Sequence, residues 1–107
     1  MTVVHVSYKP CTHYIGRPSI FASRFTTKPS KFGSIRRKPI VQVATVKEAI
    51  TKFEEEARSD PHLMAMIESL PADAVLGCFC KPGPCHGDVI ITLWQEIHFP
   101  HMEIPPA

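Results

Sequence analysis

The chain has 107 residues, and 44% of them are hydrophobic, which suits one domain with a modest core and is short for two. No stretch approaches the roughly 20 apolar residues that cross a bilayer, and the N-terminus lacks the long apolar region of a secretory signal. We therefore expect a cytoplasmic protein with no membrane partner, whose cysteines are ligands, reactive thiols or buried residues rather than stable disulfides.

The net charge of +2 hides an uneven distribution of charged residues. Residues 1–40 contain eight Lys or Arg and no Asp or Glu, whereas residues 41–107 contain four basic and ten acidic residues. A basic segment of this kind attracts phosphates or an acidic partner, or it folds against the acidic half of its own chain, and the sequence leaves both interpretations open. The eight basic residues are Lys9, Arg17, Arg24, Lys28, Lys31, Arg36, Arg37 and Lys38.

The N-terminal part of the chain shows little regular structure. A β-strand is predicted over residues 3–8, which are rich in β-branched side chains. Residues 11–38 have no convincing period and predict a long irregular segment, with a helical turn near residues 19–25. A short second strand is predicted over residues 40–44.

Two helices are predicted next along the chain. Thr45 and Glu48 fit a capping box, and apolar residues follow at helical spacing, which predicts a helix over residues 46–58. Asp60 followed by Pro61 is typical of a helix start and predicts a second, shorter helix.

The C-terminal part completes an α/β pattern. A buried strand is predicted over residues 74–80, and the last helix is predicted to begin at Cys85 or His86. The order of elements predicts a small single α/β domain, with a short, mostly parallel sheet, about three flanking helices and a long irregular N-terminal loop. We assign residues 1–98 to this domain and residues 99–107 to a proline-rich tail.

Three of the four cysteines lie between Cys78 and Asp88, where the last strand is predicted to meet the last helix. The carboxyl end of a strand and the amino end of a helix favour bound anions and reactive thiolates. Cys78 and Cys80 are two residues apart on the strand, so we expect both on one side and Phe79 on the other.

Metal binding is the first chemistry that this cluster predicts. Cys78, Cys80, Cys85 and His86 form a Cys3His set, which is typical of structural zinc and also suits iron. Against it, the spacing of Cys78 and Cys80 is shorter than that of the familiar zinc motifs.

A thiol nucleophile is the second chemistry. Cys85 at a helix start would carry it, and His86 and Asp88 are the candidates for handling protons or binding a ligand. Because adjacent helical residues diverge by roughly 100°, we expect a base other than His86, namely His5, His13 or Asp88. Two further interpretations stay open: cysteines that only fill space, and a redox pair of Cys80 with Cys85 or Cys78.

Two motifs carry a family resemblance. The stretch "LGCFCKPGPCHGDVI" resembles the signature C-[WF]-C-x-P-x-x-C-H-G/A-D-V/L of a family of short phage and bacterial proteins, which is known as a domain of unknown function. The stretch "YIGRPSIFASRF" resembles a second motif of that family, Y-I-G-R-x-S-x-x-G-N-P-F, except that Ala22, Ser23 and Arg24 replace G-N-P. The resemblance implies that the two motifs meet in one site, in a bacterial or phage-infected cell.

The second motif supplies groups for binding an anion. Gly16 allows close approach of the backbone, Arg17 offers a planar fork for phosphate, and Ser19 offers a hydroxyl. Lys81, in the turn before the last helix, is a further candidate for binding the ligand. Arg17 could instead form an ion pair with Asp88.

The sequence therefore predicts a small domain that binds a phosphate-bearing ligand, either a nucleotide or a nucleic acid. Transfer or hydrolysis at a glycosidic or phosphate linkage would fit these residues, and whether the protein is an enzyme stays open. The alternative is a non-enzymatic, zinc-stapled module that binds nucleic acid or a host protein. No feature of the sequence predicts the oligomeric state.

Overall fold

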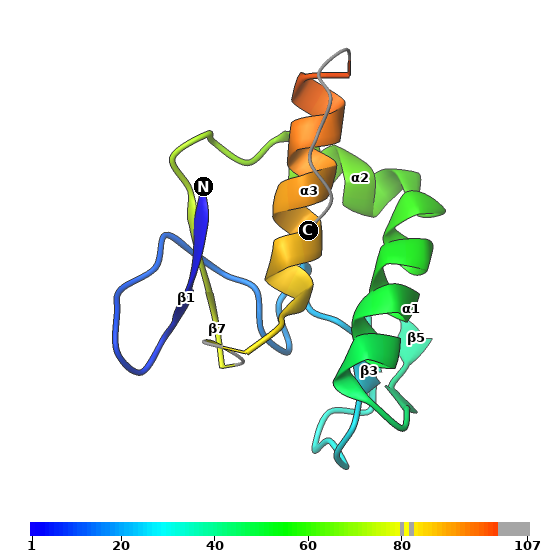
Figure 1. Cartoon of the computed structure of the whole chain (residues 1–107). Helices are drawn as coiled ribbons and strands as arrows, with labels where there is room; N and C mark the ends of the chain where they lie inside the picture. Colours follow the sequence, from blue (N-terminus) through cyan, green and yellow to red (C-terminus); the bar gives the residue numbers. More distant parts are fainter. Residues whose placement is uncertain (80, 82, 101–107) are drawn as a thin grey trace.

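The structure is a computed structural model that describes residues 1–79, 81 and 83–100. A parallel sheet contains β1 (Thr2–His5), β7 (Val75–Cys78) and β2 (His13–Tyr14), with β7 in the centre. Helices α1 and α2 precede β7 in the chain and α3 follows it, and among the described residues only α3 lies directly beside the sheet (Figure 1). The fold is therefore the mostly parallel α/β arrangement that the sequence predicts.

The helices begin where local capping predicts. Helix α1 spans Val46–Arg58, and the Thr45 side chain accepts a hydrogen bond from the Glu48 backbone amide at 3.1 Å. Helix α2 spans Pro61–Glu68, where the Asp60 carboxylate accepts from the amides of His62 and Leu63. Helix α3 spans His86–His98, and Cys85 is its N-cap residue. Each start satisfies amides that would otherwise have no partner within the helix.

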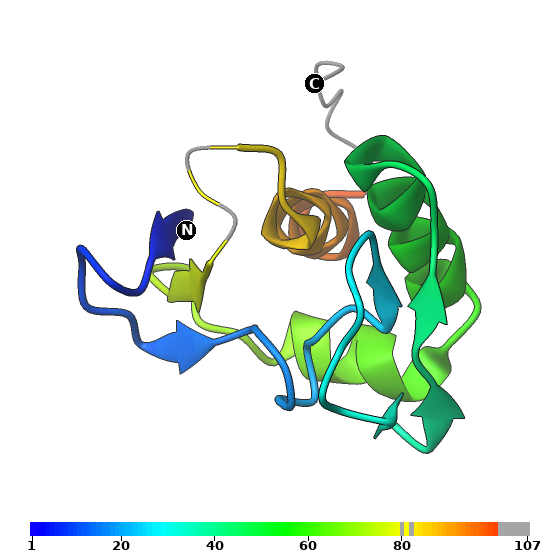
Figure 2. The same cartoon turned by 90° about the horizontal axis from the view of Figure 1, so that it is seen from below.

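Helix α3 occupies the centre of the domain. In the view along its axis it lies between the parallel sheet and the pair formed by α1 and α2, and it contacts β1, α1 and α2 (Figure 2). The buried face of α3 packs into a core that also contains side chains of the sheet, α1 and α2. This position fixes the N-terminus of α3 against the sheet and α1. The largest fully buried core side chains include Ile15, Phe53, Leu63, Ile67, Leu76, Ile90 and Leu93.

Several predicted boundaries differ in the structure. The first strand ends at His5 rather than at residue 8, because the amides of Tyr8 and Lys9 both bond to the His5 carbonyl in a turn. The predicted helical turn near residues 19–25 is replaced by two separate turns, closed by bonds from Ser19 to Gly16 and from Ala22 to Ser19. Residues at the end of this segment pair in a sheet instead of continuing a helix.

Residues 25–42 contain four two-residue strands. Strand β3 (Phe25–Thr26) pairs in parallel with β6 (Val41–Gln42), at the predicted second strand. Strands β4 (Ser34–Ile35) and β5 (Lys38–Pro39) form an antiparallel hairpin. Each is too short to leave a periodic pattern in the sequence.

The hairpin turn is unusual because Arg36 and Arg37 have positive φ angles of 51° and 64°. A two-residue turn of this kind normally uses Asn and Gly, because side chains with a Cβ disfavour positive φ. Here the Arg36 guanidinium donates to Glu56 of α1 at 2.7 Å and also to backbone carbonyls of residues 20 and 22. These contacts hold the turn in place.

The structure pairs two basic residues of the N-terminal segment with the acidic half of the chain. Arg24 and Arg36 pair with Glu56, so part of the segment does fold against the acidic half of the chain. In the described part of the chain, the other six basic residues of the segment form no such ion pair.

Residues 101–107 of the predicted tail lie outside the described residues. Among those described, no helix combines the length and apolar character of a membrane span.

Candidate functional site

The N-terminus of α3 is built around Cys85. The Cys85 backbone is extended, with φ of −146° and ψ of 148°, and its Sγ accepts a hydrogen bond from the Gly87 amide at 3.4 Å. The Asp88 carboxylate accepts from the Cys85 amide at 3.2 Å, which completes a capping box. A sulfur held at the positive end of a helix is stabilised as the thiolate.

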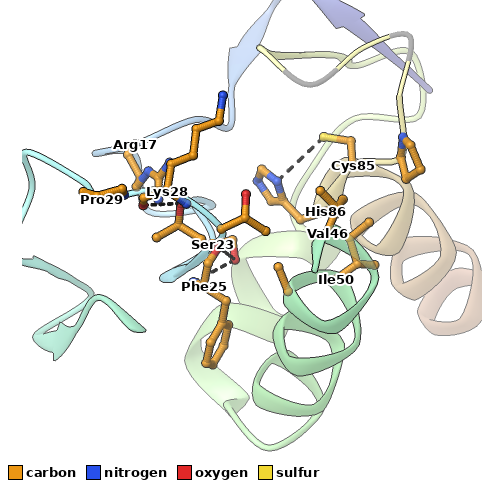
Figure 3. Close-up of a pocket in the computed structure, with 13 residues that line it drawn as sticks. Arg17, Ser23, Phe25, Lys28, Pro29, Val46, Ile50, Cys85 and His86 are labelled. Carbon is orange, nitrogen blue, oxygen red and sulfur yellow. Dashed lines mark hydrogen bonds between the residues drawn. The ribbon is translucent and has the colours of Figure 1, made fainter. Parts of the chain in front are cut away.

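Cys85 and His86 face each other, so the expectation that they diverge was wrong. The Cys85 Sγ lies 3.7 Å from the His86 Nδ1 (Figure 3). The expected divergence of adjacent residues applies inside a helix, whereas Cys85 has extended backbone angles and precedes the first turn. The other predicted bases have local partners: the His5 ring accepts from the Ser7 amide, and the His13 ring bonds to Thr12.

His86 is held as a neutral ring of one tautomer. Its Nε2 lies 2.9 Å from the Ile15 carbonyl, which can only accept, so Nε2 carries the proton and Nδ1 presents a lone pair to Cys85. Burial lowers the pKa of His86 to about 4, and the nearby cations of Arg17 and Arg36 act in the same direction, while bonds to backbone carbonyls oppose the shift. At neutral pH the His86 Nδ1 is therefore an available proton acceptor beside the Cys85 Sγ, whose single thiol proton is directed to Cys78.

Cys78 completes the described part of the cysteine cluster. Its buried Sγ accepts from the Cys85 Sγ at 3.0 Å, and Phe79 points away and is 61% exposed. Cys80, the fourth predicted metal ligand, lies outside the described residues. Among the residues that are described, no three His, Cys, Asp or Glu side chains are grouped to hold a metal ion.

Arg17 brings the N-terminal loop to this cluster. It lines a cavity of about 370 Å³ together with Cys85 and His86, and a second cavity of about 460 Å³ together with Gly16 and His86. Arg17, Ser23, Phe25 and His86 line both. The two segments, which are far apart in the sequence, therefore meet around the start of α3, with Arg17 and Ser23 across the cavity from His86 (Figure 3).

The Arg17 guanidinium has hydrogen-bonding capacity to spare. Its Nη1 is buried and has no hydrogen-bond partner in the described part of the structure. The alternative ion pair with Asp88 is not formed, because the Asp88 carboxylate pairs with Lys81 at 2.8 Å. An unpaired buried guanidinium nitrogen is costly, and a ligand anion would satisfy it.

The remaining predicted residues lie around the two cavities rather than in them. The Ser19 Oγ is buried without a described partner, but Ser19 lines neither cavity. Lys81 and Asp88 also lie outside both linings, and the hydrogen bond to Asp88 raises the pKa of Lys81. Their geometry makes Asp88 a helix cap and an ion-pair partner.

Comparison with family models assigns the chain on nearly its whole length. The model described as "Domain of unknown function (DUF4326)" matches residues 4–96. The chain belongs to this family. Comparisons with curated proteins and with solved structures gave no match. This DUF4326 domain therefore includes both motifs, all three helices up to residue 96 and both cavities.

Sequence reasoning missed one wall of the first cavity in this DUF4326 domain. Val46, Ala49 and Ile50 of α1 form an apolar surface there, with Phe25 and Lys28 on the facing loop. Val46 is 47% exposed although it starts the apolar face of α1. No signal in the sequence marks this wall, because Val46 has the spacing of an ordinary buried residue of the helix. Its exposure at the cavity is seen only once α1 is packed in the fold.

Proposed function

We propose that this DUF4326 domain binds a nucleotide in the two cavities that meet at Arg17 and His86. The observation that carries the proposal is the Arg17 guanidinium, which lines both cavities with a buried nitrogen that no described group satisfies. A phosphate is the anion that best matches a planar guanidinium fork close to a helix N-terminus.

The lining of the first cavity suits the rest of a nucleotide. Phe25, Val46 and Ile50 offer apolar surface for a base, whereas Arg17 and Lys28 offer positive charge for phosphate. Volumes of about 370 and 460 Å³ lie within the range of small-molecule sites. A combination of apolar walls and a few polar groups is the usual composition of such sites.

A catalytic form of the proposal uses Cys85 as the nucleophile and His86 as its base. The Cys85 thiol would pass its proton to the His86 Nδ1, 3.7 Å away, and the helix N-terminus would stabilise the thiolate. Because Arg17 helps to lower the pKa of His86, a phosphate bound to Arg17 would make the imidazolium less costly. Transfer and hydrolysis at a glycosidic or phosphate linkage both fit this arrangement.

Arg17→Ala is expected to weaken nucleotide binding by about 10- to 100-fold, because a charged hydrogen bond contributes about 1.5–3 kcal/mol. Calorimetric titration of the wild-type protein with nucleoside mono-, di- and triphosphates measures the effect. Arg58→Ala is the matched control, since Arg58 is an exposed arginine that lines neither cavity, and its binding constant should be unchanged. Equal affinity in Arg17→Ala, or no nucleotide binding by the wild type, would exclude the proposal.

A zinc-stapled interaction module is the second candidate, and the approach of Cys78, Cys85 and His86 favours it. The two sulfurs are 3.0 Å apart, and the Cys85 Sγ is 3.7 Å from the His86 Nδ1. Sulfur and imidazole donors suit zinc or iron. Since the described donors alone do not form a metal site, this candidate requires Cys80 as a further ligand.

Elemental analysis of protein purified without added metal separates the candidates. The zinc module predicts one metal ion per chain, which Cys85→Ser loses and Cys11→Ser retains, because Cys11 packs on Gly77 away from α3. A metal-free protein whose Cys85 is alkylated rapidly would instead support the thiol nucleophile.

Either chemistry needs reduced cysteines, so we place the function in the cytoplasm of a bacterial or phage-infected cell.

A further inference from the structure

Four aromatic rings form a continuous row at the carboxyl end of the parallel sheet. His5 ends β1, Tyr14 ends β2 and Phe79 follows β7, while Tyr8 lies in the turn after β1. The ring centroids of neighbours in the row are 4.9, 5.7 and 6.1 Å apart, in the order Tyr8, His5, Phe79, Tyr14. Parallel strands end at one edge of a sheet, which is why residues from three segments meet here.

The row is exposed rather than packed in the core. Tyr8 is 82% exposed, Phe79 61% and Tyr14 37%. Phe79 is exposed because its neighbour Cys78 faces the interior, and successive side chains of a strand alternate. Large aromatic side chains that gather on a surface mark a place of contact with a partner.

The row leads directly into the second cavity. Phe79 and Tyr14 line that cavity together with Arg17, Lys31 and Phe32. The Tyr14 ring lies so close to Gly16 that a Cβ there would be 2.3 Å from the Tyr14 hydroxyl oxygen, and that hydroxyl donates to the Arg17 carbonyl at 3.0 Å. Tyr14 therefore connects the aromatic row to Arg17, the residue that we propose binds phosphate.

Positive charge accompanies the rings. Lys9 follows Tyr8, Lys31 lies 5.4 Å from the centroid of Phe32, and Arg17 lines the cavity. These three cations have no ion pair in the described part of the chain, unlike Arg24 and Arg36. Residues 1–40 contain no acidic residue that would repel a polyanion.

We propose that the aromatic row binds single-stranded nucleic acid and delivers one nucleotide to Arg17. This inference rests on the proposed function and extends it, because it makes the nucleotide part of a strand. Bases stack on aromatic rings in a manner that tolerates any sequence, and the alternating phosphates lie on lysines and arginines. An acidic peptide would use the cations, but it carries no regular series of flat bases to stack along the row of rings.

The test measures the fluorescence anisotropy of a labelled oligothymidylate of about twelve nucleotides, a length that covers a typical single-strand site. We expect Tyr8→Ala and Phe79→Ala each to weaken binding about tenfold, and the affinity to fall with rising salt. Phe99→Ala is the matched control, because Phe99 is 46% exposed but lies at the other end of α3, and its affinity should equal that of the wild type.

Parallel titrations with a free nucleoside triphosphate separate the two proposals. Tyr8 lines neither cavity, so Tyr8→Ala should bind the mononucleotide as the wild type does. Mononucleotide binding that depends on Arg17, without binding of the oligonucleotide, would overturn this inference and leave the proposed function in place. Equal affinity for duplex and single strand, or equal competition by polyglutamate, would also overturn it. If the wild-type protein bound neither the mononucleotide nor the oligonucleotide, both the proposed function and this inference would be excluded.

Discussion

Glu56→Gln is expected to lower the free energy of unfolding by about 3–5 kcal/mol, the cost of leaving a buried charge without its partner. The Glu56 carboxylate pairs with both Arg24 and Arg36, and the side chains of Glu56 and Arg36 are only 7% and 8% exposed. The substituted glutamine would keep the size of the side chain but not its charge. Since small domains have about 5–15 kcal/mol of stability in total, the effect should be easily measured by chemical denaturation.

Glu54→Gln is the control for this measurement. Glu54 lies on the same helix and pairs with Arg58, but both side chains are more than a third exposed, at 42% and 43%. An exposed pair of this spacing contributes about 0.3–0.5 kcal/mol. If Glu54→Gln and Glu56→Gln lowered the free energy of unfolding equally, the pairs of Glu56 with Arg24 and Arg36 would not anchor the irregular segment to α1.

Stability should also fall as the pH decreases from 6.5 to 4, by about 3 kcal/mol from His86 alone. Burial lowers the pKa of His86 from 6.5 to about 4, so within this range the unfolded chain binds a proton that the folded protein does not. The stabilisation is complete above pH 6.5 and is lost as the pH falls toward 4, below which both states bind the proton. Denaturation in the presence of a chelator, repeated across this range, measures the slope.

His86→Gln identifies the contribution of this ring. A glutamine amide can replace the donor to the Ile15 carbonyl but does not titrate, so the variant should show a shallower dependence of stability on pH. His62→Gln removes an exposed histidine of α2 and should keep the wild-type slope. A wild-type slope in His86→Gln would contradict the assignment of a buried, neutral ring.

The fold class and the helices followed from the sequence. Helix α1 covers the predicted residues 46–58, and α2 and α3 begin where Asp60 and Cys85 cap them. These signals are local, because a cap and its first turn lie within three or four residues of one another. The strand at β7 was also predicted, because a buried central strand leaves a continuous apolar run.

The shape of the site needed contacts between distant residues. The loop at Arg17 reaches α3 because β2 pairs with β7, and Ile15 both bonds to Gly77 and accepts from His86. The family resemblance implied this meeting, whereas no periodicity in residues 11–38 encodes it.

The sequence by itself determined where the helices start and that a buried strand precedes the last helix. Tertiary structure alone decided the two-residue strands, the positive φ angles held by Glu56, and the neutral state of His86. The physical reason is the range of the interactions: caps and amphipathic spacing act within a few residues, whereas burial, ladder pairing and charge compensation exist only once the chain has folded.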